Sequence, residues 1–136
     1  MPIFRYKKLK IKVMSKLVKL DKNEVQYGTH LVGHLSYGIT YNDLVDAFGE
    51  PTFLPEDSGD GKVNFEWAFD FEDESGINEF TIYDWKTESA EWSKENTGTS
   101  EQAGEWFGSR WHVGGKGYGG DFIEYIEKKV GEKVVS

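Results

Sequence analysis

A glycine-rich run at residues 115–120 is the first group whose spacing could do chemistry. Its letters, GKGYGG, satisfy the pattern G-x-G-x-x-G between an expected strand and an expected helix. Helix N-termini bind phosphate through free N–H groups and the helix dipole. A dinucleotide fingerprint also needs a β-α-β unit, and Asp121 at the expected cap would repel an anion. The pattern favours a turn, with anion contact through Lys116 and Gly117 as the alternative.

The three histidines lack the spacing of a metal site or a catalytic site. His30 and His34 are four residues apart in an expected strand, which separates them by about 13 Å, too far for one metal ion. His112 lies beside Arg110 and could act as a general base, but no serine or cysteine nucleophile motif accompanies it. The chain contains no cysteine, and residues 57–61 lack EF-hand spacing. We therefore expect no metal, no cofactor and no enzymatic activity.

Aromatic side chains on expected strands are a more informative group. Tyr83 and Trp85 end one strand, and Trp106 begins another. On a sheet face turned away from the helices they would form a platform for a protein partner, for which Trp, Tyr and Arg are frequent anchors. The same platform could stack nucleotide bases, with Arg110 or Lys86 contacting phosphate. They could instead fill a second core layer or a homodimer interface.

An acidic strand face is the other candidate surface. In residues 63–71, five apolar side chains alternate with polar ones, which predicts a strand with one core face and one wet face. Glu66, Asp70 and Glu72 lie on the wet face. These carboxylates would supply charge to a docking surface.

A short helix is the clearest local signal. Thr40 and Asp43 approximate a capping box, and an apolar stripe follows as far as Phe48. Gly49 and Pro51 are typical of a helix end. We expect this helix to pack on the core face of the sheet.

The remaining elements complete the predicted architecture. Further strands are expected at 29–35, 80–85 and 106–113, and a final helix from Asp121. Polar residues 87–104 are expected to form a long acidic loop. The order predicts an α+β fold, a small antiparallel β-sheet (meander) with two short helices packed on one face.

Charge is unevenly distributed along the 136 residues, whose net charge is −8. Residues 1–22 hold eight basic side chains and a single acidic one, so residues 1–13 are interpreted as a basic N-terminal extension or edge strand. Residues 14–136 are expected to form a single α+β domain. No apolar run reaches the roughly 20 residues of a membrane span, and no secretory signal is evident. We expect a cytoplasmic protein that does not enter a membrane.

Two resemblances to known groups of proteins extend these expectations. The block at 38–51 (GIT…FGEP), followed by strands with EW and FDF, resembles the helix-then-meander unit of β-lactamase-inhibitor proteins and small outer-membrane assembly lipoproteins. This likeness covers residues 38–86 and implies the fold. The periplasmic roles do not carry over, because no signal peptide and no lipidated cysteine are present.

The second resemblance covers more of the chain. A group of small uncharacterised proteins in bacteriophage genomes is similar to this sequence in a series of short motifs: FGEP (48–51), GKV (61–63), EW (66–67), FED (71–73), TIYDWK (81–86) and WHVGG (111–115). The tight Asp-Gly turn of that group is stretched here to residues 73–76. The resemblance implies a phage or prophage accessory protein that acts inside a bacterial host.

Three functions follow as hypotheses. The leading one is a non-enzymatic phage accessory protein, with a possible anti-defence role, that binds a host protein through Glu66, Asp70, Glu72, Tyr83, Trp85 and Trp106. The alternative is a module that sequesters a nucleotide or cyclic nucleotide through Arg110, His112, Lys116 and Gly117. The third is a structural or assembly protein of the virion.

Overall fold

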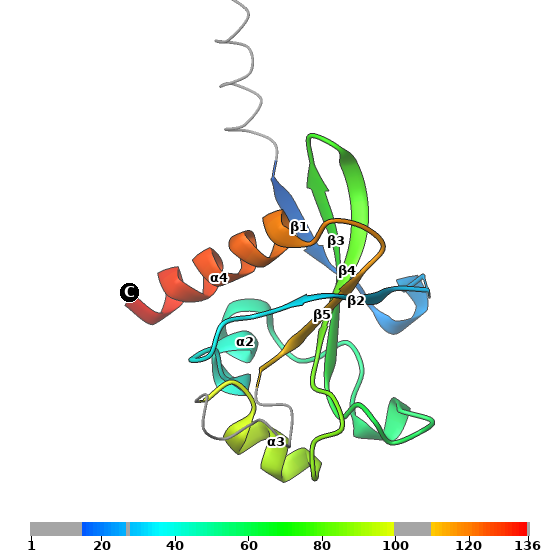
Figure 1. Ribbon diagram of the computed structural model, residues 1–136, viewed down its shortest axis with the longest axis vertical. Coiled ribbons are helices and arrows are strands. Elements are labelled where there is room, and N and C mark those ends of the chain that lie inside the picture. Colours follow the sequence, from blue (N-terminus) through cyan, green and yellow to red (C-terminus); the bar gives the residue numbers. More distant parts are fainter. Residues whose placement is uncertain (1–14, 27, 100–109, 136) are drawn as a thin grey trace, which may run out of the picture.

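The fold is built on one antiparallel sheet. The computed structural model describes residues 15–26, 28–99 and 110–135, with no side-chain description for 133–135 (Figure 1). Its five strands run in the order β1-β3-β4-β5-β2, and every neighbouring pair is antiparallel. The strands are β1 (Lys16–Lys19), β2 (His30–His34), β3 (Glu66–Asp73), β4 (Gly76–Tyr83) and β5 (His112–Gly115).

Helices complete the described chain and confirm the predicted α+β class. They are α2 (Tyr41–Phe48), α3 (Ala90–Asn96) and α4 (Gly120–Val135), with the 3₁₀ turns η1 (Lys22–Glu24) and η2 (Pro55–Asp57). In Figure 1, α2 and α4 lie to the left of the sheet, and the coils at residues 22–24 and 55–57 lie to its right. None of the helices within the described residues is long and apolar enough to span a membrane.

The predicted helix at residues 41–48 is confirmed, together with its caps. The Thr40 hydroxyl accepts the Asp43 N–H at 3.2 Å, and the Asp43 carboxylate accepts the Thr40 N–H at 3.0 Å. Gly49 has φ 84°, and its N–H donates to the Val45 carbonyl at 2.8 Å. Such a positive φ is accessible to glycine without strain.

The expectation that residues 87–104 form only a loop was wrong, and so was the expectation of two helices. The described part of this segment contains α3, which begins after Ser89, whose hydroxyl accepts the Trp92 N–H at 3.0 Å. Ser93 and Thr97 are fully buried on the inward side of this helix and its end. Because those buried residues are polar, the segment lacks the apolar stripe by which an amphipathic helix is usually detected. Residues 100–104 lie outside the described residues.

The strand boundaries also needed correction. The β3–β4 hairpin pairs Glu66 with Tyr83 and Asp73 with Gly76, so β3 begins and ends later than expected. The strand expected at 106–113 is described only from His112 and continues through Gly115; residues 106–109 lie outside the described residues. A Cβ at Gly115 would lie 2.7 Å from the Phe80 ring. Part of the glycine run therefore serves close strand packing.

An aromatic core covers one side of the sheet, here called the inner face. Trp67, Phe69 and Phe71 alternate along β3, so their side chains share this face. Phe48 of α2 lies 5.2 Å from Phe69 between ring centroids, and Phe122 of α4 lies 5.7 Å from Phe71. All three β3 rings are almost fully buried. Burial of aromatic rings at this density is the main source of stability in such a domain.

The opposite side of the sheet, the outer face, is only partly open. It bears Glu66, Ala68, Asp70 and Glu72 on β3, yet Ala68 is fully buried. The chain covers the centre of this face itself: the Gln26 N–H donates to the Glu79 carboxylate at 2.8 Å. The wet acidic face expected along the whole of β3 is therefore interrupted in the middle.

Candidate functional site

An aromatic and histidine cluster lies at one end of the outer face. The strand register places Tyr83 opposite His112, and His112 opposite His34. The His34 and His112 rings are 4.5 Å apart between centroids, Tyr83 lies 5.5 Å from His112, and Trp85 lies 6.4 Å from His112. We call Tyr83, Trp85, His112 and His34 the Trp85 patch. Trp85 is 36% exposed, which is high for a tryptophan.

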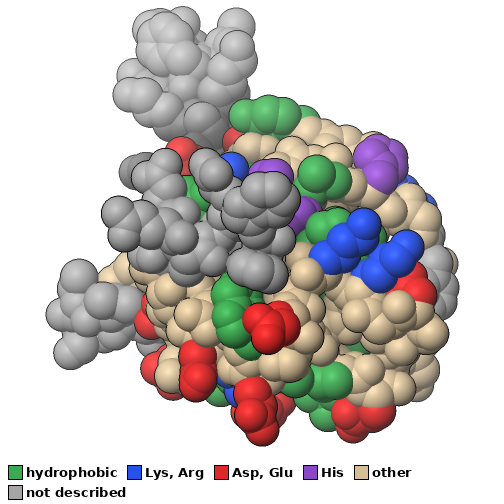
Figure 2. All heavy atoms as spheres, turned by 60° about the horizontal axis from the view of Figure 1, so that its bottom comes forward, with side chains coloured by type: hydrophobic (Ala, Val, Ile, Leu, Met, Phe, Trp, Pro, Cys, Tyr) green, Lys and Arg blue, Asp and Glu red, His purple; other side chains and the backbone are tan. Residues whose placement is uncertain are grey.

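Cationic side chains surround the Trp85 patch. The Lys86 ammonium lies 5.6 Å from the Trp85 ring centroid, and the Lys62 ammonium lies 6.0 Å from it. Arg110 lies 5.1 Å from the Tyr37 ring. In the part of the chain that the structure describes, none of these three cations forms an ion pair with a carboxylate. Figure 2 shows Lys and Arg side chains next to hydrophobic and histidine side chains, with most acidic side chains of that view lying lower.

The two patch histidines are held in the neutral form near pH 7. Burial lowers the pKa of His34, and the neighbouring His112 and Arg110 charges lower it further. Burial also lowers the pKa of His112, against the opposing effect of its contact with the Arg110 carbonyl. A neutral imidazole costs less to desolvate than a charged one, so the patch can pack rings against a ligand without an added charge.

A buried carboxylate network supports the patch from beneath. Asp84 is fully buried, and its Oδ1 accepts the backbone N–H groups of Asn64 at 2.8 Å and Phe65 at 3.0 Å. Its Oδ2 accepts the hydroxyls of Thr87 at 2.9 Å and Ser93 at 2.8 Å. These four hydrogen-bond donors compensate for the loss of water around the buried Asp84 carboxylate. The network ties α3 to the end of β4 and so fixes the residue that follows Asp84, which is Trp85.

A separate cleft lies on the covered middle of the outer face. Its volume is about 330 Å³. Glu66, Glu79 and Thr81 on β3 and β4 line it. Two loops supply the walls, through the described residues Val25, Gln26, Gly28, Thr29, Phe53, Leu54, Asp57 and Ser58. We call this the Glu66 cleft. The alternation along β3 predicted that Glu66 lies on an open acidic surface; this was wrong, because a segment distant in sequence folds over it.

Burial changes the chemistry of Glu66. It raises the pKa of this carboxyl from 4.5 to about 7, and the negative charges of Asp84 and Glu79 add to the rise. The nearby Thr81 hydroxyl acts in the opposite direction. A carboxyl with such a pKa is partly protonated at neutral pH.

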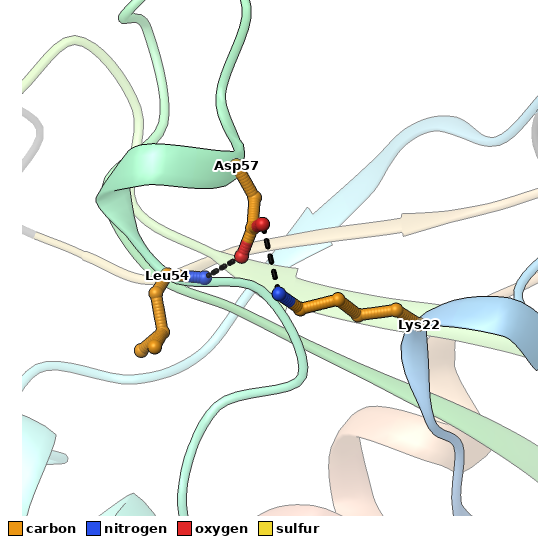
Figure 3. Close-up of polar contacts among 3 residues, drawn as sticks. All are labelled: Lys22, Leu54 and Asp57. Atoms are coloured by element: carbon orange, nitrogen blue, oxygen red, sulfur yellow. Dashed lines mark hydrogen bonds and ion pairs between the residues drawn. The ribbon is translucent and has the colours of Figure 1, made fainter.

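An ion pair ties together the two loops at the edge of the Glu66 cleft. The Lys22 ammonium lies 2.8 Å from Asp57 Oδ1, and the other oxygen of Asp57 accepts the Leu54 N–H at 2.8 Å (Figure 3). These contacts lower the pKa of Asp57, with the backbone N–H of Leu54 as the largest cause. Both acceptor oxygens of Asp57 are therefore already engaged.

The structure divides the residues predicted for partner binding. Tyr83 and Trp85 lie in the Trp85 patch, whereas Glu72 lies opposite Ile77, about 20 Å along the sheet. Asp70 lies between these ends, opposite Glu79. Trp106 lies outside the described residues. Of the three aromatic residues predicted to form one platform, the structure therefore describes only Tyr83 and Trp85.

The residues predicted for nucleotide or anion contact are also divided. His112 is part of the Trp85 patch, and Arg110 lies near it. Lys116 and Gly117 follow the far end of β5, about 13 Å from His112 along the strand. One small ligand held by all four residues is therefore not favoured by this geometry.

Several residues of the two sites were not predicted as partner-binding or ligand-binding residues from the sequence. His34 enters the Trp85 patch because β2 pairs with β5, and Lys62 enters it through the turn before β3. Glu79 and Thr81 enter the Glu66 cleft through the β3–β4 register. The alternation of residues 79, 81 and 83 along one strand was the available signal. It was weak because an aromatic side chain occupies each face of that strand.

Comparison with known proteins does not place this chain in a family. No protein-family model, no curated protein and no solved structure matches this chain. Within the described ranges, no group of three or more His, Cys, Asp or Glu side chains is placed to hold a metal ion. The resemblance to bacteriophage proteins therefore stays a prediction.

Proposed function

We propose that this chain is a non-enzymatic binding protein that docks on another protein through the Trp85 patch. The observation that carries the proposal is a 36% exposed tryptophan on a strand end, packed against other rings and flanked by lysines. Tryptophan, tyrosine and arginine dominate the binding energy of protein interfaces. The neutral histidines add contact area at low desolvation cost.

The acidic end of the outer face completes the proposed surface. Asp70 and Glu72 lie within about 20 Å of Tyr83 along the hairpin. A standard interface covers roughly 800 Å² on each partner, which is wide enough to include both ends. Charges at the rim of an interface mainly change the association rate. We therefore expect the Trp85 patch to supply most of the binding energy, and Asp70 and Glu72 to increase the rate of association with the partner.

The sequence resemblance gives the proposal its setting. A bacteriophage accessory protein would act in the cytoplasm of the bacterial host, and its partner would be a host protein. An anti-defence role is one form that this function could take. It rests on the motif likeness and on the exposed anchor residues, and it needs no cofactor.

Affinity capture from bacterial host lysate tests the proposal. Wild-type protein, Trp85→Ala and the control Tyr118→Ala are compared, because Tyr118 is also an exposed aromatic residue, at 81%, but lies beyond the far end of β5. We expect one partner to be retained by wild type and Tyr118→Ala and weakened at least about tenfold by Trp85→Ala. Equal capture by all three folded proteins would refute the role of the patch.

A nucleotide is the second candidate ligand, and a specific observation favours it. Two ammonium groups lie over the exposed Trp85 ring, and a base with a phosphate needs both a stacking surface and a cation. Calorimetric titration with mononucleotides and cyclic nucleotides tests this. Lys62→Ala and Lys86→Ala should weaken binding, whereas Lys129→Ala, whose ammonium lies over Tyr125 on α4, should not. Absence of heat in the wild-type titration at millimolar ligand would exclude it.

A further inference from the structure

The Glu66 cleft is not used by the proposed docking surface and has its own chemistry. It occupies about 330 Å³ between the sheet and two loops. That volume accommodates a small organic group and is far larger than one water molecule requires. Its lining combines a few polar groups with apolar side chains from Val25, Phe53, Leu54 and Val63.

The polar groups of the cleft include acceptors that have no donor. The Glu79 Oε2 atom is buried without a hydrogen-bond partner among the described residues, while its other oxygen accepts the Gln26 N–H. Thr81 is only 2% exposed, and its hydroxyl has no partner of good hydrogen-bond geometry in the described part, although it lies near enough to the Glu66 carboxyl to lower its pKa. Buried polar atoms in native proteins are almost always paired. Glu79 Oε2 and the Thr81 hydroxyl therefore retain hydrogen-bonding capacity that a ligand in this cleft can use.

The charge balance specifies the ligand further. Glu66 and Glu79 contribute two carboxyl groups, Lys22 at the rim is already paired with Asp57, and Lys116 reaches the rim at Gly28. A ligand that supplies donors and a positive charge matches the two carboxyl groups. The apolar walls suit a short alkyl stem better than a hydrated metal ion, which requires more oxygen ligands.

We propose that the Glu66 cleft binds a primary ammonium group carried on an alkyl stem. The ammonium lies between Glu66, Glu79 and the Thr81 hydroxyl, and the stem lies against the apolar walls. Three donors of an alkylammonium match these three acceptors. This inference goes beyond the proposed docking function, because it uses none of the Trp85 patch residues.

Two sources could supply the same chemistry. One is a free alkylamine, and the other is a lysine side chain of a protein. Both present an ammonium at the end of a flexible apolar stem. The experiment distinguishes them by the probe that binds.

The protonation state of Glu66 supports the site and adds a measurable consequence. Its raised pKa reflects burial and the Asp84 and Glu79 charges, and a bound ammonium would favour the ionised form. Tyr83 also faces this carboxyl, and Asp57 and Lys22 lie at the rim. Binding at pH 7 should therefore release protons, and affinity should fall as acidification protonates Glu66.

Titration of the full chain with butylammonium chloride tests the inference. Amide chemical shifts and heats are recorded for wild type, Glu66→Gln, Thr81→Val and the control Glu72→Gln, which changes an exposed carboxylate on the same face. We expect saturable shifts around the cleft and about tenfold weaker binding in Glu66→Gln. Thr81→Val should weaken it less, and Glu72→Gln should bind as wild type does. Proton release should be present in wild type and absent in Glu66→Gln.

Matched probes make the test decisive. 1-Butanol has a comparable stem without the charge, and butylguanidinium has the charge in a planar group. Nα-acetyl-lysine methylamide presents a lysine side chain. Binding of this last probe in the cleft would name lysine as the source; binding of butylammonium alone would name a free amine. Either result upholds the site.

Three outcomes would overturn the inference. One is equal binding of 1-butanol, which would indicate an apolar cleft only. Another is equal weakening in Glu66→Gln and Glu72→Gln, which would indicate general charge attraction. The last is absence of saturable shifts in folded wild-type protein. Thermal melting of each variant shows whether a loss reflects unfolding, and Trp85→Ala should leave butylammonium binding unchanged.

Discussion

Asp84 and Glu66 are two carboxyl groups near the same hairpin, and they have opposite surroundings. Asp84 accepts two backbone N–H groups and two hydroxyls. Burial raises the pKa of Glu66 to about 7, the Asp84 and Glu79 charges add to the rise, and the Thr81 hydroxyl opposes it. The folded protein thus provides donors for one carboxyl group and leaves the other short of them.

This difference separates a structural role from a ligand-binding role. A buried charge with a full set of donors stabilises the fold and has no capacity left for a ligand. A largely buried carboxyl with few donors is costly when ionised, and groups of this kind are frequent at functional sites. Asp84 is fully buried and Glu66 is partly exposed, and the count of donors separates the two groups further.

The largest expected effect comes from Asp84→Ala. The change leaves several buried donors without an acceptor, so we expect a loss of roughly 3–5 kcal/mol in the free energy of unfolding. Urea denaturation of wild type, Asp84→Ala and the exposed control Glu72→Ala measures it. A loss below about 1 kcal/mol would show that the Asp84 network does not hold α3 to the sheet.

The next effect is a pH dependence that belongs to Glu66. Its folded pKa lies above 4.5 at about 7, so the folded state binds the proton more tightly than the unfolded state. The resulting stability is full below pH 4.5 and is lost as pH rises through about 7, by roughly 3 kcal/mol at most.

Glu66→Gln removes this dependence. The variant should match wild type near pH 5 and be more stable than wild type at pH 8. Urea denaturation at both values, with Glu72→Gln as the control, measures the difference. An unchanged difference between variant and wild type across this range would show that Glu66 is not desolvated.

A smaller effect is expected from Ser93→Ala. The Ser93 hydroxyl donates to Asp84 and lies 3.0 Å from the Thr97 hydroxyl. Its loss removes one of four donors, so the free energy of unfolding should fall by about 1–2 kcal/mol. Ser58→Ala, at a loop hydroxyl, should change it by less than about 0.5 kcal/mol. A loss as large as that of Asp84→Ala would contradict a shared network.

The smallest effect concerns the histidines of the Trp85 patch. The pKa of His34 is lowered by burial and by His112, so acidification below 6.5 should destabilise the fold as the folded state resists protonation. His112→Gln removes one cause and should raise the pKa of His34. Titration of His34 by NMR measures it, and a fall in that pKa would contradict the assigned coupling.

Sequence patterns were sufficient where each residue is stabilised by close neighbours. The helix at 41–48 was predictable because its caps, Thr40 and Gly49, lie next to it in the chain. The β3–β4 hairpin was predictable because alternating aromatic residues mark its inner face. Helix α3 was missed because its inward residues are polar. Ser93 donates to Asp84, which precedes the helix, and Thr97 bonds to Ser93.

The candidate sites show the same limit. Tyr83, Trp85 and His112 were selected from their types, and the structure places them together. His34 joins them only through strand pairing between β2 and β5. Glu66 was assigned to open solvent because alternation shows which side of a strand a residue occupies, but not what covers that side.

The sequence by itself determined the class of fold, the aromatic inner face and the residue types available for binding. Local hydrogen bonds and hydrophobic periodicity are sufficient for these, since they act over a few residues. Only the tertiary structure decided that Asp84 is surrounded by hydrogen-bond donors and that Glu66 lines a cleft. Both outcomes depend on segments some 20 to 50 residues apart, because hydrogen-bond partners and desolvation come from the folded neighbourhood and not from the adjoining chain.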